Sequence, residues 1–183
     1  VSEEPRRVGL DLAWDVFERA EFFKMSLGNT LDSSEDEIYE YCIENGVVSL
    51  GFGDGLDYTG MTETQIRSKG SAAQMGPYDI TAMNLFVNYL RKGNYVVVSS
   101  GNRYIRAIGK VTGDYKFVRD SPFPNHPTWK HFREVEWLYH GEKIPSAKVY
   151  NRNLSQMTIY KFDKREINRE FFVESEERGE FSE

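Results

Sequence analysis

The stretch from residue 95 to residue 139 constrains the fold most, because it reads as a series of strands. Residues 95–99 and 104–111 are rich in β-branched and aromatic side chains, and Gly-Asn and Gly-Asp turn signals follow them. A loop with three prolines occupies residues 121–129, and residues 131–139 then alternate as a half-buried strand does. So many consecutive strands argue against a doubly wound sheet and predict a curved antiparallel or mixed barrel.

Before this run, the chain predicts strands and helices in alternation. Residues 21–29 and 47–52 are apolar or β-branched and short, so they predict strands, and residues 62–69 predict a short helix. A last strand is predicted at residues 158–162, and a charged helix is predicted from Asp163. The order predicts an α+β protein: a curved β-barrel of about six strands flanked by helices.

Two segments carry the clearest helical signals. Residues 34–46 place Ser34 at an N-cap position with Glu37 three residues later, the pattern of a capping box. Residues 78–92 begin beside Asp79, which is expected to cap this helix, and they end before a glycine. Apolar side chains recur at helical spacing on one face of this second helix and are expected to be buried: Ile80, Met83, Phe86, Val87 and Leu90.

The composition fits one intracellular domain. A chain of 183 residues with 39% hydrophobic and 14% aromatic residues is large enough for one core. The single cysteine, Cys42, excludes an internal disulfide and a cysteine metal cluster. The apolar runs are too short to span a membrane, and the first residues lack a signal-peptide core. We therefore expect a cytoplasmic protein without a membrane partner.

The net charge of −6 hides an uneven distribution. Residues 1–65 hold 15 acidic and 4 basic residues, a formal charge of −11. Residues 91–133 hold 9 basic and 2 acidic residues, a formal charge of +7, whereas residues 166–183 return to −5. The basic middle is either a solvated face of the sheet or the binding surface of an anionic partner such as a phosphate chain.

Motifs typical of catalysis or cofactor binding are absent from the sequence. It has no GxxxxGKS or GxxxxGKT phosphate loop and no GxSxG nucleophile elbow. The histidines, His126, His131 and His140, lack the helical spacing of a zinc site. We therefore expect that the protein is not an enzyme and has no metal ion or cofactor.

Five segments together resemble the EVE and YTH domains of the PUA-like group: FFKMSLGN, NGVVSLGF, GNYVVVSS, YIRAIGKVTG and FREVEWLYHGEKIPS. In those domains a β-barrel with flanking helices reads a modified base. The segment GKVTGDYKF, the proline-rich loop and REVEWL are similar to the EVE-like N-terminal domain of McrB-type modification-dependent restriction proteins. The resemblance implies a helical extension at residues 1–20, a base-binding domain at 21–165 and a charged helix or linker at 166–183.

In the McrB-type systems, an AAA+ GTPase motor follows the recognition domain and a separate nuclease cuts. The resemblance therefore implies that this chain is the recognition part and that its linker leads towards a missing motor. It implies binding to methylated DNA, with N6-methyladenine as the first choice, by flipping the base into an aromatic pocket. The alternatives with the same fold are 5-methylcytosine in DNA and methylated RNA. A protein-interaction module that binds no nucleic acid is the alternative from another class, and the negative net charge favours it.

The resemblance places the base pocket beside the glycine-rich residues 51–60, where glycines allow the backbone to approach a flat ligand. Phe52 and Trp129 are expected to stack on the base, Tyr115 to form a further wall, and Asn29 to contact the base edge. For each aromatic residue, ordinary packing in the core or on the sheet is the alternative.

Four further residues belong to the expected pocket. Ser49 and Leu50 are expected to present backbone groups to the exocyclic amine of the base. Asp54 and Asp57 are expected either to accept from that amine or to cap the loop backbone. The phosphates are expected to meet seven basic side chains, for which a solvated position is the alternative: Arg103, Arg106, Lys110, Lys116, Arg119, Lys130 and Arg133.

Overall fold

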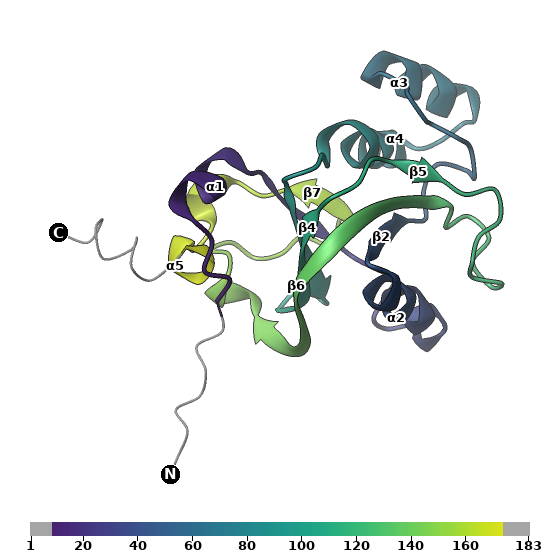
Figure 1. Ribbon diagram of the computed structural model, residues 1–183. Coiled ribbons are helices and arrows are strands. Elements are labelled where there is room, and N and C mark those ends of the chain that lie inside the picture. Colours follow the sequence, from purple (N-terminus) through teal and green to yellow (C-terminus); the bar gives the residue numbers. More distant parts are fainter. Residues whose placement is uncertain (1–8, 174–183) are drawn as a thin grey trace, which may run out of the picture.

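The computed structural model describes residues 9–173 and shows a mixed sheet that curls between helices (Figure 1). Six strands lie in the order β2-β6-β4-β3-β1-β7, and β5 pairs in addition with β6. β1 and β3 are parallel, and the other pairings are antiparallel. The predicted α+β class, with a curved sheet of about six strands and flanking helices, is confirmed. The strands are β1 (Phe22–Met25), β2 (Val47–Leu50), β3 (Tyr95–Ser100), β4 (Tyr104–Val111), β5 (Lys116–Phe117), β6 (His131–Pro145) and β7 (Ile159–Lys161).

The long strand β6 joins the two halves of the sheet. Its first residues pair with β2, and its later residues pair with β4. The strand was predicted only to residue 139, but it continues to Pro145, and Ile144 lies opposite Ile105. The register shifts at this point and Gly141 has a φ of 140°, so a bulge accommodates the glycine without ending the strand.

The sheet is covered on both faces, because successive side chains of its central strands point to opposite sides. Phe22 and Val97 join one buried cluster, whereas Phe23 and Val98 join the other. The larger cluster packs under α2 (Asp36–Asn45), α3 (Glu63–Ala72) and α4 (Pro77–Asn84), and the smaller one under α1 (Trp14–Arg19) and α5 (Arg169–Phe172).

Within residues 9–173, no helix is long and apolar enough to cross a membrane.

α2 begins after a 3-10 turn rather than at Ser34. Asp32 caps this turn, Ser33–Glu35, because its Oδ1 accepts a hydrogen bond from the backbone N–H of Ser34 at 3.0 Å. Ser34 therefore lies inside the turn, and the predicted capping box with Glu37 is wrong. The predicted end of the helix is confirmed, since Gly46 takes a left-handed conformation with φ 62°.

α3 carries a capping box, formed by Thr62 and Gln65.

The helical segment that comes next, between α3 and β3, differs from its prediction at both ends. α4 begins with Pro77, so Asp79 lies within the first turn and makes no capping bond, contrary to the prediction. A π-helical turn, Leu85–Tyr89, follows α4. The five apolar residues predicted on one face of this segment are all buried, which confirms its packing face.

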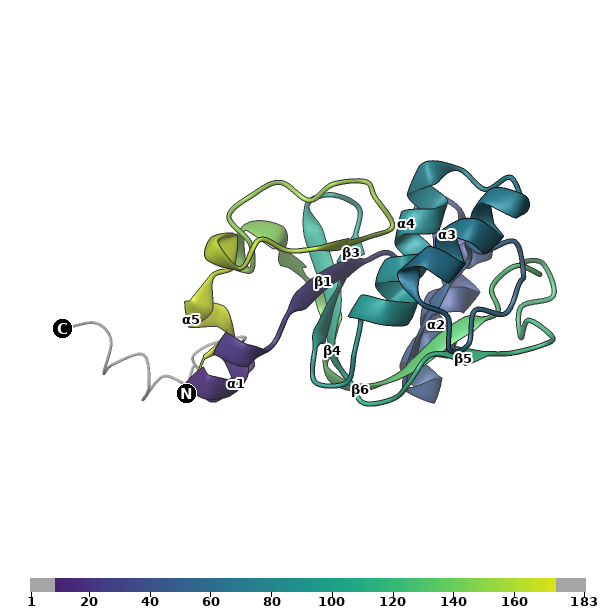
Figure 2. The ribbon, with the colours of Figure 1, turned by 90° about the horizontal axis from the view of Figure 1, so that it is seen from above.

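Both ends of the described chain pack on the same side of the sheet (Figure 2). The ring of Phe22 contacts Phe17 of α1 and Phe172 of α5, at centroid distances of 5.3 and 4.8 Å. The packed domain therefore extends past the predicted boundary at residue 165, because the residues after it supply part of the core. The rest of the predicted extension and linker, residues 1–8 and 174–183, lies outside the described residues.

Candidate functional site

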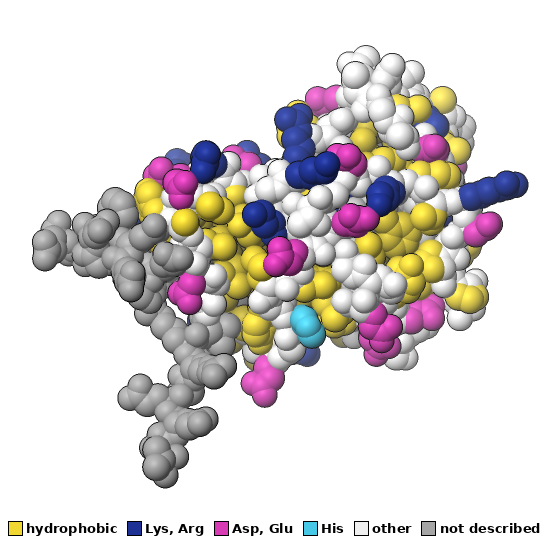
Figure 3. Space-filling model, viewed as in Figure 1, with side chains coloured by type: hydrophobic (Ala, Val, Ile, Leu, Met, Phe, Trp, Pro, Cys, Tyr) yellow, Lys and Arg dark blue, Asp and Glu magenta, His cyan; other side chains and the backbone are white. Residues whose placement is uncertain are grey.

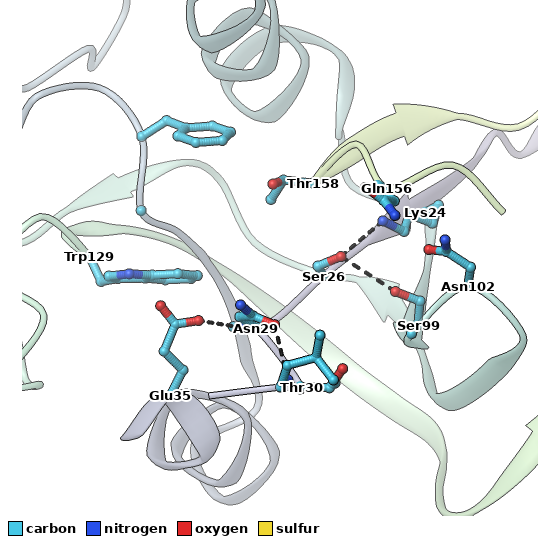
Figure 4. Close-up of a pocket in the computed structure, with 15 residues that line it drawn as sticks. Lys24, Ser26, Asn29, Thr30, Glu35, Ser99, Asn102, Trp129, Gln156 and Thr158 are labelled. Atoms are coloured by element: carbon cyan, nitrogen blue, oxygen red, sulfur yellow. Dashed lines mark hydrogen bonds between the residues drawn. The ribbon is translucent and has the colours of Figure 1, made fainter. Parts of the chain in front are cut away.

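A cavity of about 740 Å³ opens beside the carboxyl ends of β1 and β3 (Figure 4). Because these two strands are parallel, the segments that leave them diverge here, one towards α2 and the other into the turn before β4. The segments after β2, before β6 and before β7 close the remaining sides. The volume lies in the range of small-ligand sites.

The aromatic wall of the cavity consists of Trp129 and Phe52. A Cβ added to Gly51 would lie 2.6 Å from the indole Cε2 and Nε1 atoms, so the indole lies directly against the backbone of this glycine. Phe52 follows in sequence, and its ring meets that of Tyr78 edge-on at a centroid distance of 5.9 Å. Both wall residues are half-buried, which leaves aromatic surface for a flat ligand.

Asn29 lies on the loop that leaves β1 and is held by its neighbours. Its backbone N–H donates to Oε2 of Glu35, and its side-chain oxygen accepts from the backbone N–H of Leu31 at 3.0 Å. Gly28 starts the loop with a φ of 86°. The side-chain nitrogen of Asn29 has no partner among the described residues, so it is available to an acceptor in the cavity.

The opposite side of the cavity is polar, and none of its residues was among those predicted for the pocket. Lys24 is 1% exposed, and its Nζ donates to Oγ of Ser26 at 2.9 Å and to the carbonyl oxygen of Met157. Burial lowers the pKa of Lys24 to about 8. The only sequence signal was one lysine within an apolar strand. We call this group the polar end: Lys24, Ser26, Ser99, Asn102 and Gln156.

Three of the eight residues predicted for the pocket line this cavity: Phe52, Trp129 and Asn29. Ser49 and Leu50 do not, since they are fully buried in β2 opposite Phe132 and His131. Their assignment to the pocket is corrected, because β2 pairing occupies the segment that was expected to face the ligand.

The other three predicted pocket residues lie elsewhere. Tyr115 shares a hydrogen bond of 2.6 Å with Nδ1 of His131 and packs on the larger core, and burial raises its pKa. Asp57 accepts from the backbone N–H and the hydroxyl of Thr59, at 2.9 and 2.6 Å. Tyr115, Asp57 and the exposed Asp54 do not line the cavity. For Asp57 the structure shows the loop-capping alternative.

Three of the predicted phosphate-binding residues are engaged within the protein. Arg133 is 4% exposed and donates to the carbonyl oxygens of Phe86, Val87 and Gly113, at 2.8, 2.6 and 2.9 Å. Its assignment to phosphate is therefore wrong, because its position on the buried face of β6 directs it into the core.

Arg106 and Lys116 also have protein partners. The guanidinium of Arg106 lies 3.8 Å from the centroid of the Tyr39 ring and donates to the backbone of Leu27. Lys116 forms an exposed salt bridge of 2.6 Å with Glu134.

The remaining basic residues have more access to solvent. Arg103 and Arg119 are exposed, and Lys110 and Lys130 are half-buried. Arg103 follows the cavity residue Asn102, and Lys130 follows Trp129. On the face seen in Figure 3, acidic side chains gather over α2. Among residues 9–173, no three histidine, cysteine or acidic side chains are grouped so that they could hold a metal ion.

A family model described as "Domain of unknown function (DUF8426)" matches residues 23–163 of this chain. Among solved structures, the fold is similar to the YTH domain of the Zygosaccharomyces rouxii MRB1 protein, solved in complex with N6-methyladenosine RNA. The identity is 13% and the TM-score is 0.38, and the match covers 74% of this chain and 66% of that chain, just under two thirds of its length. No curated protein matches the sequence.

Proposed function

Because the chain belongs to the DUF8426 family, whose function is unknown, we propose a function from its own cavity. The domain binds nucleic acid that carries a methylated base and holds that base against the aromatic wall. The observation that carries this proposal is the half-buried indole of Trp129, which lies directly against Gly51 beside Phe52 in one cavity.

Stacking supplies the affinity in this proposal. A base on an aromatic side chain gains about 1–3 kcal/mol, and every base has a face that can stack. A methyl group that enters the cavity adds about 0.8 kcal/mol for the buried carbon. The domain would therefore bind a methylated base several-fold more tightly than the plain base.

Hydrogen bonds to the base edge supply selectivity. A base that leaves water needs partners for its polar atoms, since unpaired buried polar atoms are costly. The side-chain nitrogen of Asn29, which has no partner among residues 9–173, is a donor for a ring nitrogen of the base. We propose N6-methyladenine in DNA as the ligand, because adenine offers such acceptors beside its methylated amine.

The cavity is lined by the segments that follow β1, β2 and β3, and a base in a duplex must rotate out of its stack to enter such a cavity. Arg103 and Lys130 are adjacent in sequence to cavity residues and are our choice for phosphate contacts. The acidic side chains Asp32 and Glu35 on the loop after β1 repel phosphate. We therefore expect few phosphate contacts and a shallow dependence of affinity on salt.

The test is a binding titration with labelled duplexes that differ only in one base: N6-methyladenine, 5-methylcytosine or no modification. Matched RNA oligonucleotides and two salt concentrations complete the set. We expect preference for N6-methyladenine DNA, and W129A and F52A should abolish that preference. Y89A is the control, since Tyr89 is 46% exposed and does not line the cavity.

Each outcome of this titration is informative. Preference for 5-methylcytosine or for methylated RNA would support a reader of methylated bases but contradict N6-methyladenine in DNA as its ligand. Equal binding to all duplexes would leave a phosphate-binding surface only. No binding to any oligonucleotide would overturn the proposal in favour of a protein-interaction module.

We also propose that the domain itself performs no catalysis and serves a modification-dependent restriction system. An AAA+ GTPase motor and a nuclease would then act on the DNA that this domain selects. This part rests on the sequence resemblance to McrB-type proteins. A fusion of this domain to an McrB-type motor, with its nuclease, should restrict phage with methylated DNA, and the W129A fusion should not.

A further inference from the structure

Lys24 is a buried cation without an anionic partner. Among the described residues it forms no ion pair, and its neighbours are neutral: the Ser26 hydroxyl, the Met157 carbonyl and the Tyr160 ring. Two of the three N–H groups of its ammonium have hydrogen-bond acceptors in the protein. Burying an unpaired ammonium is costly, so a cavity that keeps one is prepared for an anion.

The groups around Lys24 suit a phosphate. The hydroxyls of Ser26 and Ser99 lie 3.4 Å apart, and the side-chain amides of Asn102 and Gln156 line the same end of the cavity (Figure 4). All four supply N–H or O–H donors, which phosphate oxygens accept. Among residues 9–173, the acidic residue that lines the cavity is Glu35, which lies beside Asn29 and away from Lys24.

The aromatic wall and the polar end face the same cavity. Figure 4 shows Trp129 on one side, Lys24, Ser99 and Asn102 on the other, and Asn29 between them. A nucleotide has the same division, with a flat base at one end and an anionic phosphate at the other.

We infer that the polar end binds the phosphate of the nucleotide whose base stacks on the aromatic wall, with Lys24 as the principal contact. The cavity then takes a whole nucleotide rather than a base alone. This inference rests on the proposed function, since the base defines which phosphate comes within reach.

The experiment uses four small probes and calorimetric titration of the full chain. The probes are 2′-deoxyadenosine, N6-methyl-2′-deoxyadenosine and the 5′-monophosphate of each. We expect each monophosphate to bind at least about tenfold more tightly than its nucleoside, the scale of one charge-assisted contact. We expect each methylated probe to bind more tightly than its plain counterpart.

Lys24→Met tests the phosphate contact, because methionine has a similar length without the charge. This variant should bind the nucleosides as the wild type does and should lose the preference for monophosphates. Lys161→Met is the matched control: Lys161 is exposed on the neighbouring strand β7 and pairs with Glu21. Lys161→Met removes the same net charge as Lys24→Met and should keep the preference for monophosphates. Ser99→Ala is a second, smaller change that should weaken monophosphate binding only.

The four probes separate the two proposals. Equal binding of nucleosides and monophosphates would overturn the phosphate contact and leave the base reader intact. A monophosphate preference that depends on Lys24 but not on methylation would support the phosphate contact and overturn the methylated-base reader. An equal loss for all four probes in Lys24→Met, or no binding of any probe to the wild type, would overturn the inference.

Discussion

The indole ring of Trp129 lies so close to Gly51 that a Cβ at that position would be 2.6 Å from two of its atoms. This contact joins the proline-rich loop before β6 to the segment that follows β2. It places the indole and Phe52, the residue after the glycine, in the wall of one cavity. The glycine is therefore needed for close approach, and the side chain that it admits is an aromatic ring.

The variant G51A should displace the indole of Trp129. Real Cβ atoms do not approach other atoms within 3.0 Å, so the ring must shift, and overpacking of this kind costs about 1–3 kcal/mol. We expect a changed tryptophan fluorescence, with W129F as the reference, and a reduced preference for methylated DNA. The control is G76A, because the nearest atom to a Cβ there is 4.0 Å away. An unchanged spectrum in G51A would contradict the close contact.

Removing the charge of Lys24 should stabilise the fold. The folded state holds the pKa of this lysine at about 8, below its ordinary value of 10.5. Between these pH values the unfolded chain binds a proton that the folded chain has released, so stability from this group rises as the pH increases from about 8 to 10.5. Urea denaturation should show K24M to be more stable than the wild type at pH 7, with a smaller difference at pH 10.

A K24M protein that is less stable than the wild type at pH 7 would contradict this account. K161M is the control, since Lys161 is exposed and its ion pair with Glu21 is a surface one, so this change should cost less than about 1 kcal/mol.

His131 should make the fold sensitive to acid. Burial lowers its pKa to about 4 from an ordinary value of 6.5, so the folded chain resists protonation that the unfolded chain accepts. Stability should therefore fall as the pH decreases from 6.5 to 4. H131Q should show a shallower decrease across this window, and the exposed H140Q should follow the wild type. Identical slopes in wild type and H131Q would exclude this role.

Arg133 is the counterpart of Lys24: a buried cation whose Nε, Nη1 and Nη2 atoms each donate a hydrogen bond to a backbone carbonyl oxygen. Its three carbonyl acceptors would be left without a donor in R133M, so we expect a loss of about 3–5 kcal/mol in the free energy of unfolding. K116M removes an exposed salt bridge with Glu134 and should cost less than about 1 kcal/mol. Comparable losses in the two variants would contradict the buried role of Arg133.

The local sequence pattern was sufficient to predict strand limits, helix ends and buried positions wherever these depend on one face of one element. The strand at residues 104–111 has the predicted limits, and the five apolar residues from Ile80 to Leu90 are all buried. Gly46 ends α2 because a left-handed residue there is a local requirement. The sequence also singled out Phe52, Trp129 and Asn29, which the structure brings to one cavity. Their contact with a base stays a prediction.

Tertiary structure decided which polar residues are inside. A strand pattern shows that Lys24 and Arg133 each lie on one face of a strand, but it does not show what covers that face. Parallel pairing of β1 with β3 and the crossing of β6 between two halves of the sheet bury both cations. Their surroundings then differ, since Arg133 meets three carbonyl oxygens and Lys24 faces a cavity. Such surroundings come from segments distant in sequence, and periodicity along the chain carries no information about them.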